Sequence, residues 1–233
     1  MVDLSAEAAE LWASLGPPAP GRARAVQFVA ARRGEGTSTV ARELARFAAT
    51  RAGRTVWLVD LDLFGSPQHT AFSTHPDLYG RFGPSVAATP DGTVFFTVQP
   101  PTPMPDGTLA PDARFLEAHQ VGGQKLWVTR FRADVLRGKQ AVHILPSADY
   151  WASLKRYADL IIVDSPSSDR SQSALTVAPY MDQTVLVVSS DQPDVQAPAK
   201  LRDAITAAGG RPAGVFFNRA QVEAPRFLRA ILP

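Results

Sequence analysis

The stretch Ala31–Ser38 contains residues that could hold a phosphate group. It reads A-R-R-G-E-G-T-S, which follows most of the phosphate-loop pattern G-x-x-x-x-G-K-[S/T]. Gly34 and Gly36 allow the backbone to curl so that its N–H groups surround a phosphate, and the helix that follows adds positive potential. Ser38 provides the hydroxyl that binds Mg²⁺ in such loops, but Thr37 stands where the pattern has lysine. The sequence therefore predicts a phosphate loop without its lysine, and the alternative is a plain tight turn.

Three aspartates follow apolar runs that are typical of buried strands. Asp60 and Asp62 come after Thr55–Val59, and Asp164 comes after Leu160–Val163. In an open α/β sheet, ligands bind beyond the carboxyl ends of the parallel strands. Carboxylate oxygens suit Mg²⁺, and phosphoryl transfer depends on neutralising charge. We expect the three aspartates near the phosphate loop, and the alternative is that Asp60 and Asp164 only cap neighbouring backbone groups.

The order of the elements predicts an α/β fold with a mostly parallel sheet and helices on both faces. Leu4–Leu15 has apolar residues on one helical face and predicts a leading helix. Continuous apolar strands that alternate with helical segments are typical of parallel sheets. The predicted strands cover residues 25–30, 55–59, 160–163, 184–188 and 214–217. A chain of 233 residues is within the range of one domain, so we predict a single domain over residues 1–233.

Residues 75–142 differ in composition from the flanking segments. They are rich in Pro, Gly and Thr, and they contain short strand-like runs at residues 94–98 and 126–128. We interpret this range as an irregular insertion or an elaborated edge of the domain. Within it, Pro100–Pro105 is predicted to form an exposed polyproline-like loop, and a role in docking a partner is one interpretation of that loop.

The composition limits the function classes. Lys and Arg total 24 against 22 Asp and Glu, so the net charge of +2 gives no support for nucleic-acid binding. The chain has no cysteine, which excludes disulfides and thiolate chemistry, and its four histidines lack metal-ligand spacing. The sequence has no apolar run long enough to span a membrane, and its start does not resemble a signal peptide, so a cytoplasmic protein is expected.

Four segments resemble one family. Arg33–Thr39 reads R-G-E-G-T-S-T, which is similar to the loop P-G-E-G-K-S-T of the bacterial tyrosine kinases of polysaccharide export. Val59–Pro67 is similar to their D-x-D signature, with Phe64 where an arginine is usual. Ile162–Pro166 matches the strand that ends in D-[S/T]-P, and Gly214–Arg219 resembles the segment near the adenine. The chain therefore resembles these kinases and, more distantly, the Min and partitioning ATPases, which implies a P-loop NTPase-like domain.

The resemblance implies a role for each matched residue. Ser38, Asp60 and Asp164 would bind Mg²⁺, and Asp60, Asp62 and Asp164 would be the catalytic carboxylates of an active member. The cofactor would be ATP or ADP with Mg²⁺. The implied nucleotide contacts are Arg32, Arg33, Gly34, Glu35, Gly36, Thr37, Ser38, Thr39, Asn218 and Arg219.

The missing lysine predicts weak chemistry. Its contact is worth about 1.5 to 3 kcal/mol, or roughly 10- to 150-fold in affinity, and losing one preorganised donor costs about 10² to 10³ in rate. Arg32 occupies the position of a second lysine of the ATPase group and could grip phosphate, or it could be a solvated charge. A serine hydrolase is excluded because the chain has no G-x-S-x-G elbow.

The two ends of the chain lack features of the kinases. No tyrosine lies beyond Tyr180, and Glu7–Leu15 has no arginine where the ring-forming helix has two. Residues 226–232 are expected to dock on the core, with membrane contact as the alternative. We therefore predict a degenerate member that regulates exopolysaccharide biosynthesis through an inner-membrane polysaccharide co-polymerase-like partner. The alternative is a nucleotide-dependent dimeric ATPase switch of the Min or partitioning type.

Overall fold

The structure is a computed structural model of the chain. It describes residues 4–16, 21–89, 91–191 and 194–219. The expectation for residues 226–232 therefore lies outside the described residues. None of the described helices is long and apolar enough to cross a bilayer.

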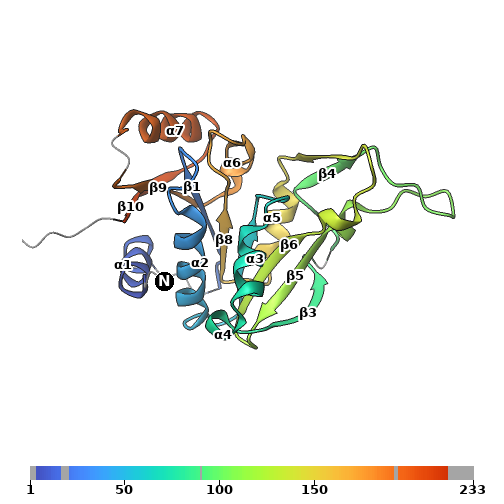
Figure 1. Ribbon diagram of the computed structural model, residues 1–233, viewed down its shortest axis with the longest axis horizontal. Coiled ribbons are helices and arrows are strands. Elements are labelled where there is room, and N and C mark those ends of the chain that lie inside the picture. Colours follow the sequence, from blue (N-terminus) through green and yellow to red (C-terminus); the bar gives the residue numbers. More distant parts are fainter. Residues whose placement is uncertain (1–3, 17–20, 90, 192–193, 220–233) are drawn as a thin grey trace, which may run out of the picture.

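Eight strands form the main sheet, in the spatial order β10-β9-β1-β8-β2-β6-β5-β3. The strands from β10 to β6 pair in parallel, whereas β5 and β3 join antiparallel. Their bounds are β1 Arg24–Ala30, β2 Val56–Asp60, β3 Phe82–Ala87, β5 Leu116–Val121, β6 Leu126–Phe131, β8 Leu160–Asp164, β9 Gln183–Ser189 and β10 Pro212–Asn218. The predicted α/β fold with a mostly parallel sheet is confirmed (Figure 1).

Helices cover both faces of this sheet. One face packs against α1, α2 and α3, and the other packs against α5, α6 and α7. Their bounds are α1 Ser5–Leu15, α2 Thr37–Ala49, α3 Pro67–Thr74, α4 Pro76–Tyr79, α5 Ala148–Lys155, α6 Ser173–Val177 and α7 Gln196–Ala207, with short 3-10 turns η1 Asp112–Phe115, η2 Ala133–Val135 and η3 Ala178–Tyr180.

Alternation of side chains along each central strand explains this layering. In β2, Val56 and Leu58 point into the core beneath α2, whereas Trp57 and Val59 point into the core beneath α5. Successive residues of a strand face opposite sides of its sheet. Because all four side chains are apolar and almost fully buried, β2 must be covered on both faces. An apolar run without polar alternation is the sequence signal of such a strand.

The middle segment adds strands to the sheet rather than standing apart from it. β3, β5 and β6 extend the main sheet, while β4 (Phe96–Gln99) and β7 (Ala141–Ile144) pair antiparallel as a separate ribbon. The chain between β4 and β5 projects away from the sheet (Figure 1). Phe96 meets Phe131 of β6 edge to face at 5.2 Å, and both belong to the same core as Ile161 of β8. The ribbon is therefore joined to the main sheet by aromatic packing.

Candidate functional site

The loop between β1 and α2 has the backbone shape that its glycines allow. Gly34 and Gly36 have φ angles of 91° and 93°, in the left-handed region that glycine adopts without steric cost. A Cβ atom at Gly36 would lie 2.0 Å from Nδ2 of Asn218. Gly36 is therefore required twice, once for its backbone angle and once for the close approach of β10.

Residues at the end of β10 donate hydrogen bonds to the backbone of this loop. Asn218 Nδ2 donates to the Glu35 carbonyl oxygen at 2.9 Å. Arg219 Nη2 donates to the Gly34 carbonyl oxygen at 3.0 Å, while its Nη1 pairs with Asp191 Oδ2 at 3.0 Å. The two residues that the sequence assigns to the nucleotide site therefore contact the loop directly, through its carbonyl groups.

Glu35 fixes the loop from inside, and Thr37 leaves it without a cation at the lysine position. Glu35 is only 3% exposed, and its carboxylate accepts from the backbone N–H of Arg32 at 2.8 Å and of Ser189 at 3.4 Å. Thr37 is also buried and opens α2. Glu35 thus joins the loop to the end of β9, and the first residue of α2 has a short neutral side chain where the phosphate-loop pattern has lysine.

Asp60 is the last residue of β2 and Asp62 lies just after it, and both accept hydrogen bonds from backbone groups. Asp60 Oδ1 accepts from Asp62 N and Oδ2 from Gln68 N, each at 3.0 Å. Burial raises the pKa of Asp60 well above its usual value, and the nearby charge of Asp164, its register partner on β8, adds to this effect. Asp62 Oδ1 accepts from Gly65 N at 2.9 Å. Asp60 thus shapes the turn after β2, and its role toward a metal stays a prediction.

Asp164 is the last residue of β8 and is buried beside Ser38 and Gln68. Burial raises its pKa to about 6, although the Ser38 hydroxyl, the Gln68 amide and the Arg42 guanidinium act to lower it. Its Oδ2 accepts from Gln68 Nε2 at 2.6 Å. Its Oδ1 is buried and has no hydrogen-bond partner within the described ranges. A buried oxygen without a partner is costly, so this atom is suited to an external ligand.

Gln68 connects these groups, and the sequence analysis did not single it out. It is fully buried in the first turn of α3. Besides the bond to Asp164, its Nε2 donates to the Ser38 carbonyl oxygen at 2.9 Å, and its Oε1 accepts from Arg42 Nη1 at 3.3 Å. The available signal was its place directly after Pro67, the last residue of the D-x-D segment. Gln68 thereby holds the phosphate loop and both strand-end carboxylates in one network.

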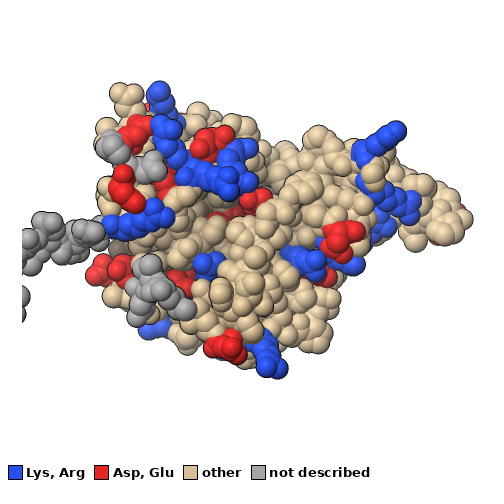
Figure 2. All heavy atoms as spheres, viewed as in Figure 1, with Lys and Arg blue, Asp and Glu red and all other residues tan. Residues whose placement is uncertain are grey.

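A cavity of about 390 Å³ lies over this network. Figure 2 shows basic side chains gathered above the end of the sheet where β1 leads into α2, close to acidic side chains. The described lining residues are Arg32, Arg33, Gly34, Gly36, Thr37, Ser38, Thr39, Asp62, Gly65, Pro67, Asp164, Ser165, Pro166, Ser167 and Arg170. Loop and carboxylates from distant parts of the sequence are thus brought to one cavity.

A second cavity of about 790 Å³ lies on the other side of Asn218, between α1 and β10. Gly36 of the loop and Thr39 of α2 line both cavities. Its volume is in the range of small-molecule sites. The two cavities therefore flank the same turn, one facing the carboxylates and one facing the edge strand.

The donor set of the smaller cavity suits Mg²⁺ accompanied by phosphate. Among the described residues, no three His, Cys, Asp or Glu side chains are grouped as metal ligands. Mg²⁺ is usually held by one or two carboxylates together with waters and substrate phosphates. The unpartnered oxygen of Asp164 and the nearby hydroxyl of Ser38 match that requirement, since each supplies a hard oxygen.

No protein-family model matches the chain, and a search of the curated proteins finds no match. Solved structures do resemble it. The kinase domain of VpsO has a TM-score of 0.59 at 19% identity, over 93% of this chain and 95% of that one. The kinase domain of the Escherichia coli tyrosine kinase ETK has 0.54 at 14%, over 87% and 71%. A ParA family ATPase from Chlorobium tepidum TLS has 0.50 at 18%, over 86% and 75%.

The fold is therefore that of a single-domain P-loop NTPase, as the sequence predicts. More particularly, it is the fold shared by bacterial tyrosine kinase domains and ParA-type ATPases. These likenesses concern the fold, and the roles of individual residues stay predictions that rest on the geometry above.

Proposed function

We propose that the chain binds ATP or ADP with Mg²⁺ at this loop and transfers or hydrolyses phosphate weakly or not at all. The proposal depends on Thr37, a buried threonine at the lysine position of an otherwise formed loop. The loop has its two glycines with positive φ, and the Asp164 oxygen without a partner among the described residues lies nearby. Binding groups are thus kept, and the cation that stabilises developing charge is lost.

Within this proposal each residue has a separate task. Ser38 and Asp164 would hold Mg²⁺, which when bound neutralises phosphate charge. The N–H groups that begin α2 would donate to the phosphates, because the helix N-terminus has unsatisfied donors and positive potential. Asp60, with Gln68, keeps the turn after β2 in position. Asp62 would orient a water or hydroxyl if any transfer occurs.

We assign this weakened nucleotide site to a regulatory protein of the tyrosine-kinase type. The resemblance of four segments and the shared fold support this assignment. The expected partner is an inner-membrane polysaccharide co-polymerase-like protein, which would recruit the chain to the membrane and through which it would influence exopolysaccharide biosynthesis. Co-purification of that protein with the tagged chain from membranes of the source cells tests the assignment, and its absence from the purified material would contradict it.

The nucleotide proposal is tested by titration with a fluorescent ATP analogue, with and without Mg²⁺. The wild type is expected to bind only with Mg²⁺, and Thr37→Lys is expected to bind about 10- to 150-fold more tightly. Thr206→Lys adds the same charge at an exposed position of α7 and serves as the matched control. Phosphate release should stay near background in the wild type.

Two results would contradict the proposal. Failure of both the wild type and Thr37→Lys to bind would remove the nucleotide site. Steady-state turnover of the wild type at ordinary ATPase rates would remove the claim of weak chemistry, although not the claim of binding.

A nucleotide-dependent dimer is the second candidate, and Arg32 favours it. Its side chain is half exposed at the rim of the cavity and pairs with Asp194. A guanidinium in that place could reach the phosphates of a second copy. Sedimentation with and without Mg-ATP tests this candidate, because a switch should dimerise only with nucleotide.

A further inference from the structure

The turn Ser167–Arg170 follows the third signature segment and is held firmly against the phosphate loop. Ser168 N donates to the Ala30 carbonyl oxygen at 2.9 Å, and Asp169 N donates to the Ala31 carbonyl oxygen at 3.3 Å. In return, Asp169 Oδ2 accepts from Arg33 N at 3.2 Å. The turn therefore both donates hydrogen bonds to the loop and accepts one from it. These bonds fix the backbone that carries the last residue of the turn.

That residue is Arg170. Its side chain lines the same 390 Å³ cavity as Gly36 and Thr37, and it is 45% exposed. Its Nη1 lies 3.3 Å from Asp62 Oδ2. Asp62 Oδ1 is engaged by Gly65 N, so the aspartate is itself fixed and holds the guanidinium over the cavity.

The other arginines close to the loop are placed differently. Arg32 pairs with Asp194. Arg42 is buried and directs Nη1 to Gln68, on the protein side of the network. Arg33 lines the cavity, and its backbone N–H is bonded to Asp169. Arg32, Arg33 and Arg170 all line the cavity, and among these three only Arg170 has a described ion pair with a carboxylate of the site, Asp62.

We propose that Arg170 supplies, from the opposite wall of the cavity, the cation that the loop lacks at Thr37, and that it contacts the terminal phosphates of a bound nucleoside triphosphate. The inference rests on the proposed function. Phosphate would compete with Asp62 for the guanidinium, which can grip a phosphate with two parallel N–H donors. Arg170 would thus reach the phosphates from the turn after β8, whereas the lysine of the phosphate-loop pattern would reach them from the first residue of α2.

The test is a titration of the full chain with a fluorescent ATP analogue in Mg²⁺. Arg170→Ala should weaken binding about 10- to 150-fold, the range for one charge-assisted contact. Arg170→Lys should fall between the wild type and Arg170→Ala, because it keeps the charge and loses the fork. Arg156→Ala is the matched control, since Arg156 is a surface arginine that pairs with Asp91 at 2.9 Å away from this cavity.

A double variant distinguishes a phosphate contact of Arg170 from a purely structural role. If Arg170 supplies the contact that the loop lacks, Thr37→Lys should tighten binding more in the Arg170→Ala background than in the wild type. Equal gains in the two backgrounds would overturn this role, because Thr37→Lys would then act independently of Arg170. Circular dichroism checks folding of each variant, and Arg170→Lys preserves the test if Arg170→Ala does not fold.

The outcomes separate the role of Arg170 from the existence of the nucleotide site. Binding by the wild type with equal binding by Arg170→Ala overturns the role of Arg170 and leaves the nucleotide site in place. Equal losses in Arg170→Ala and Arg156→Ala also overturn it, because the effect is then one of net charge. No binding by the wild type or by Thr37→Lys overturns the nucleotide site and this role together.

Discussion

Two parts of the main sheet bury charge to different extents: the five strands from β10 to β2 with the phosphate loop, here called the loop end, and the strands β6, β5 and β3, here called the other end. Around the phosphate loop, Glu35, Arg42, Asp60 and Asp164 are all buried. In the described part of residues 75–142 no charged side chain is buried to that degree, and the core there is apolar and includes four buried phenylalanines. Burying charge opposes folding unless it is paired or bonded. Glu35, Arg42 and Asp60 have hydrogen-bond partners, whereas Asp164 Oδ1 has none among the described residues. The cost in stability at the loop end therefore falls mainly on Asp164, and the apolar packing of the other end offsets that cost.

The strongest test of this comparison is whether both ends unfold together. Phe28 of β1 and Phe95 before β4 are both fully buried, and Phe95 packs edge to face on Tyr150 at 4.8 Å. Each change to alanine should lower the free energy of unfolding by about 3 to 5 kcal/mol. Because the aromatic cluster includes Trp57 and Ile161 of the main sheet, urea denaturation followed by fluorescence and circular dichroism should give one transition for both variants.

Two separate transitions, with Phe95→Ala affecting only one, would show that the middle segment is an independent unit. That outcome would break the comparison, because one end could then no longer offset the cost of the other.

Alanine substitutions at two glycines, Gly36 and Gly107, test how tightly the backbone is packed in the two regions. Gly36 and Gly107 both have positive φ, 93° and 84°, but only Gly36 has an atom within 4 Å of where a Cβ would lie. Gly36→Ala should cost about 2 to 5 kcal/mol, from strain and overpacking against Asn218. Gly107→Ala should cost only the strain, about 1 to 2 kcal/mol. Urea midpoints measure both, and equal losses would mean that the contact with Asn218 carries no energy.

The pH dependence of stability should follow from Asp164 at the loop end. Its pKa is raised to about 6 by burial, so the folded state keeps a proton that the unfolded state releases near pH 4. The stability this contributes is full below about pH 4 and is lost as the pH rises to about 6. Asp164→Asn should reduce that slope and raise stability near pH 7, and the slope that remains is expected from Asp60, whose pKa is also raised by burial. An unchanged pH profile in urea denaturation would contradict this.

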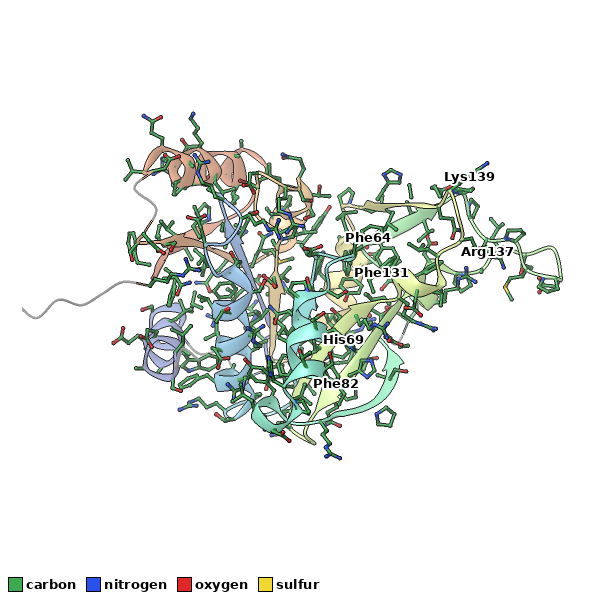
Figure 3. All side chains as sticks on the ribbon, in the orientation of Figure 1. Phe64, His69, Phe82, Phe131, Arg137 and Lys139 are labelled. Carbon is green, nitrogen blue, oxygen red and sulfur yellow. The ribbon has the colours of Figure 1, made fainter. Side chains whose placement is uncertain are left out.

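His69 should give the opposite slope at the other end. It stacks on Phe82 at 5.0 Å (Figure 3), and its pKa is lowered to about 4 by burial and by the charges of Arg130 and His119, against Glu117. A histidine kept neutral contributes stability that is full above about pH 6.5 and is lost as the pH falls toward 4. His69→Gln should therefore flatten the acid side of the profile, and a steeper loss would contradict this.

The smallest effect is expected at the boundary between the two ends. Phe64, in the loop after Asp62, is 64% exposed and meets Phe131 of β6 at 5.8 Å (Figure 3). Phe64→Ala should cost about 0.5 to 1.5 kcal/mol, the value of one aromatic pair. Thermal unfolding measures it, and a loss as large as that of Phe95→Ala would show that the loop is part of the core.

The parallel part of the fold could be predicted from the sequence because its strands are apolar throughout. Leu160–Val163 and Thr184–Val188 can only be buried on both faces, and their alternation with helices implies parallel pairing. The middle strands carry no such signal. β3 has mostly exposed side chains, and β4 pairs with β7 across more than forty positions of sequence. The periodicity of a sequence does not reveal a pairing over that separation.

The candidate site also has residues that the sequence could predict and residues that it could not. Its loop and carboxylates follow short local patterns, so the sequence could predict them. Gln68 and Arg170 could not be singled out, because each acts through atoms far away in the chain, on Asp164 and Asp62 respectively. Single polar residues after a signature look like ordinary surface residues until the fold shows what faces them.

The contact between Gly36 and Asn218 also constrains how this chain can diverge. Asn218 bonds to the carbonyl group beside Gly36 across 183 positions of sequence, and it fills the space that any larger residue at position 36 would need. A larger residue at position 36 therefore needs a smaller one at position 218, and it would still be strained by the backbone angle of 93°. In descendants of this protein, the edge strand and the loop should change as a pair, even where nucleotide chemistry no longer selects for either.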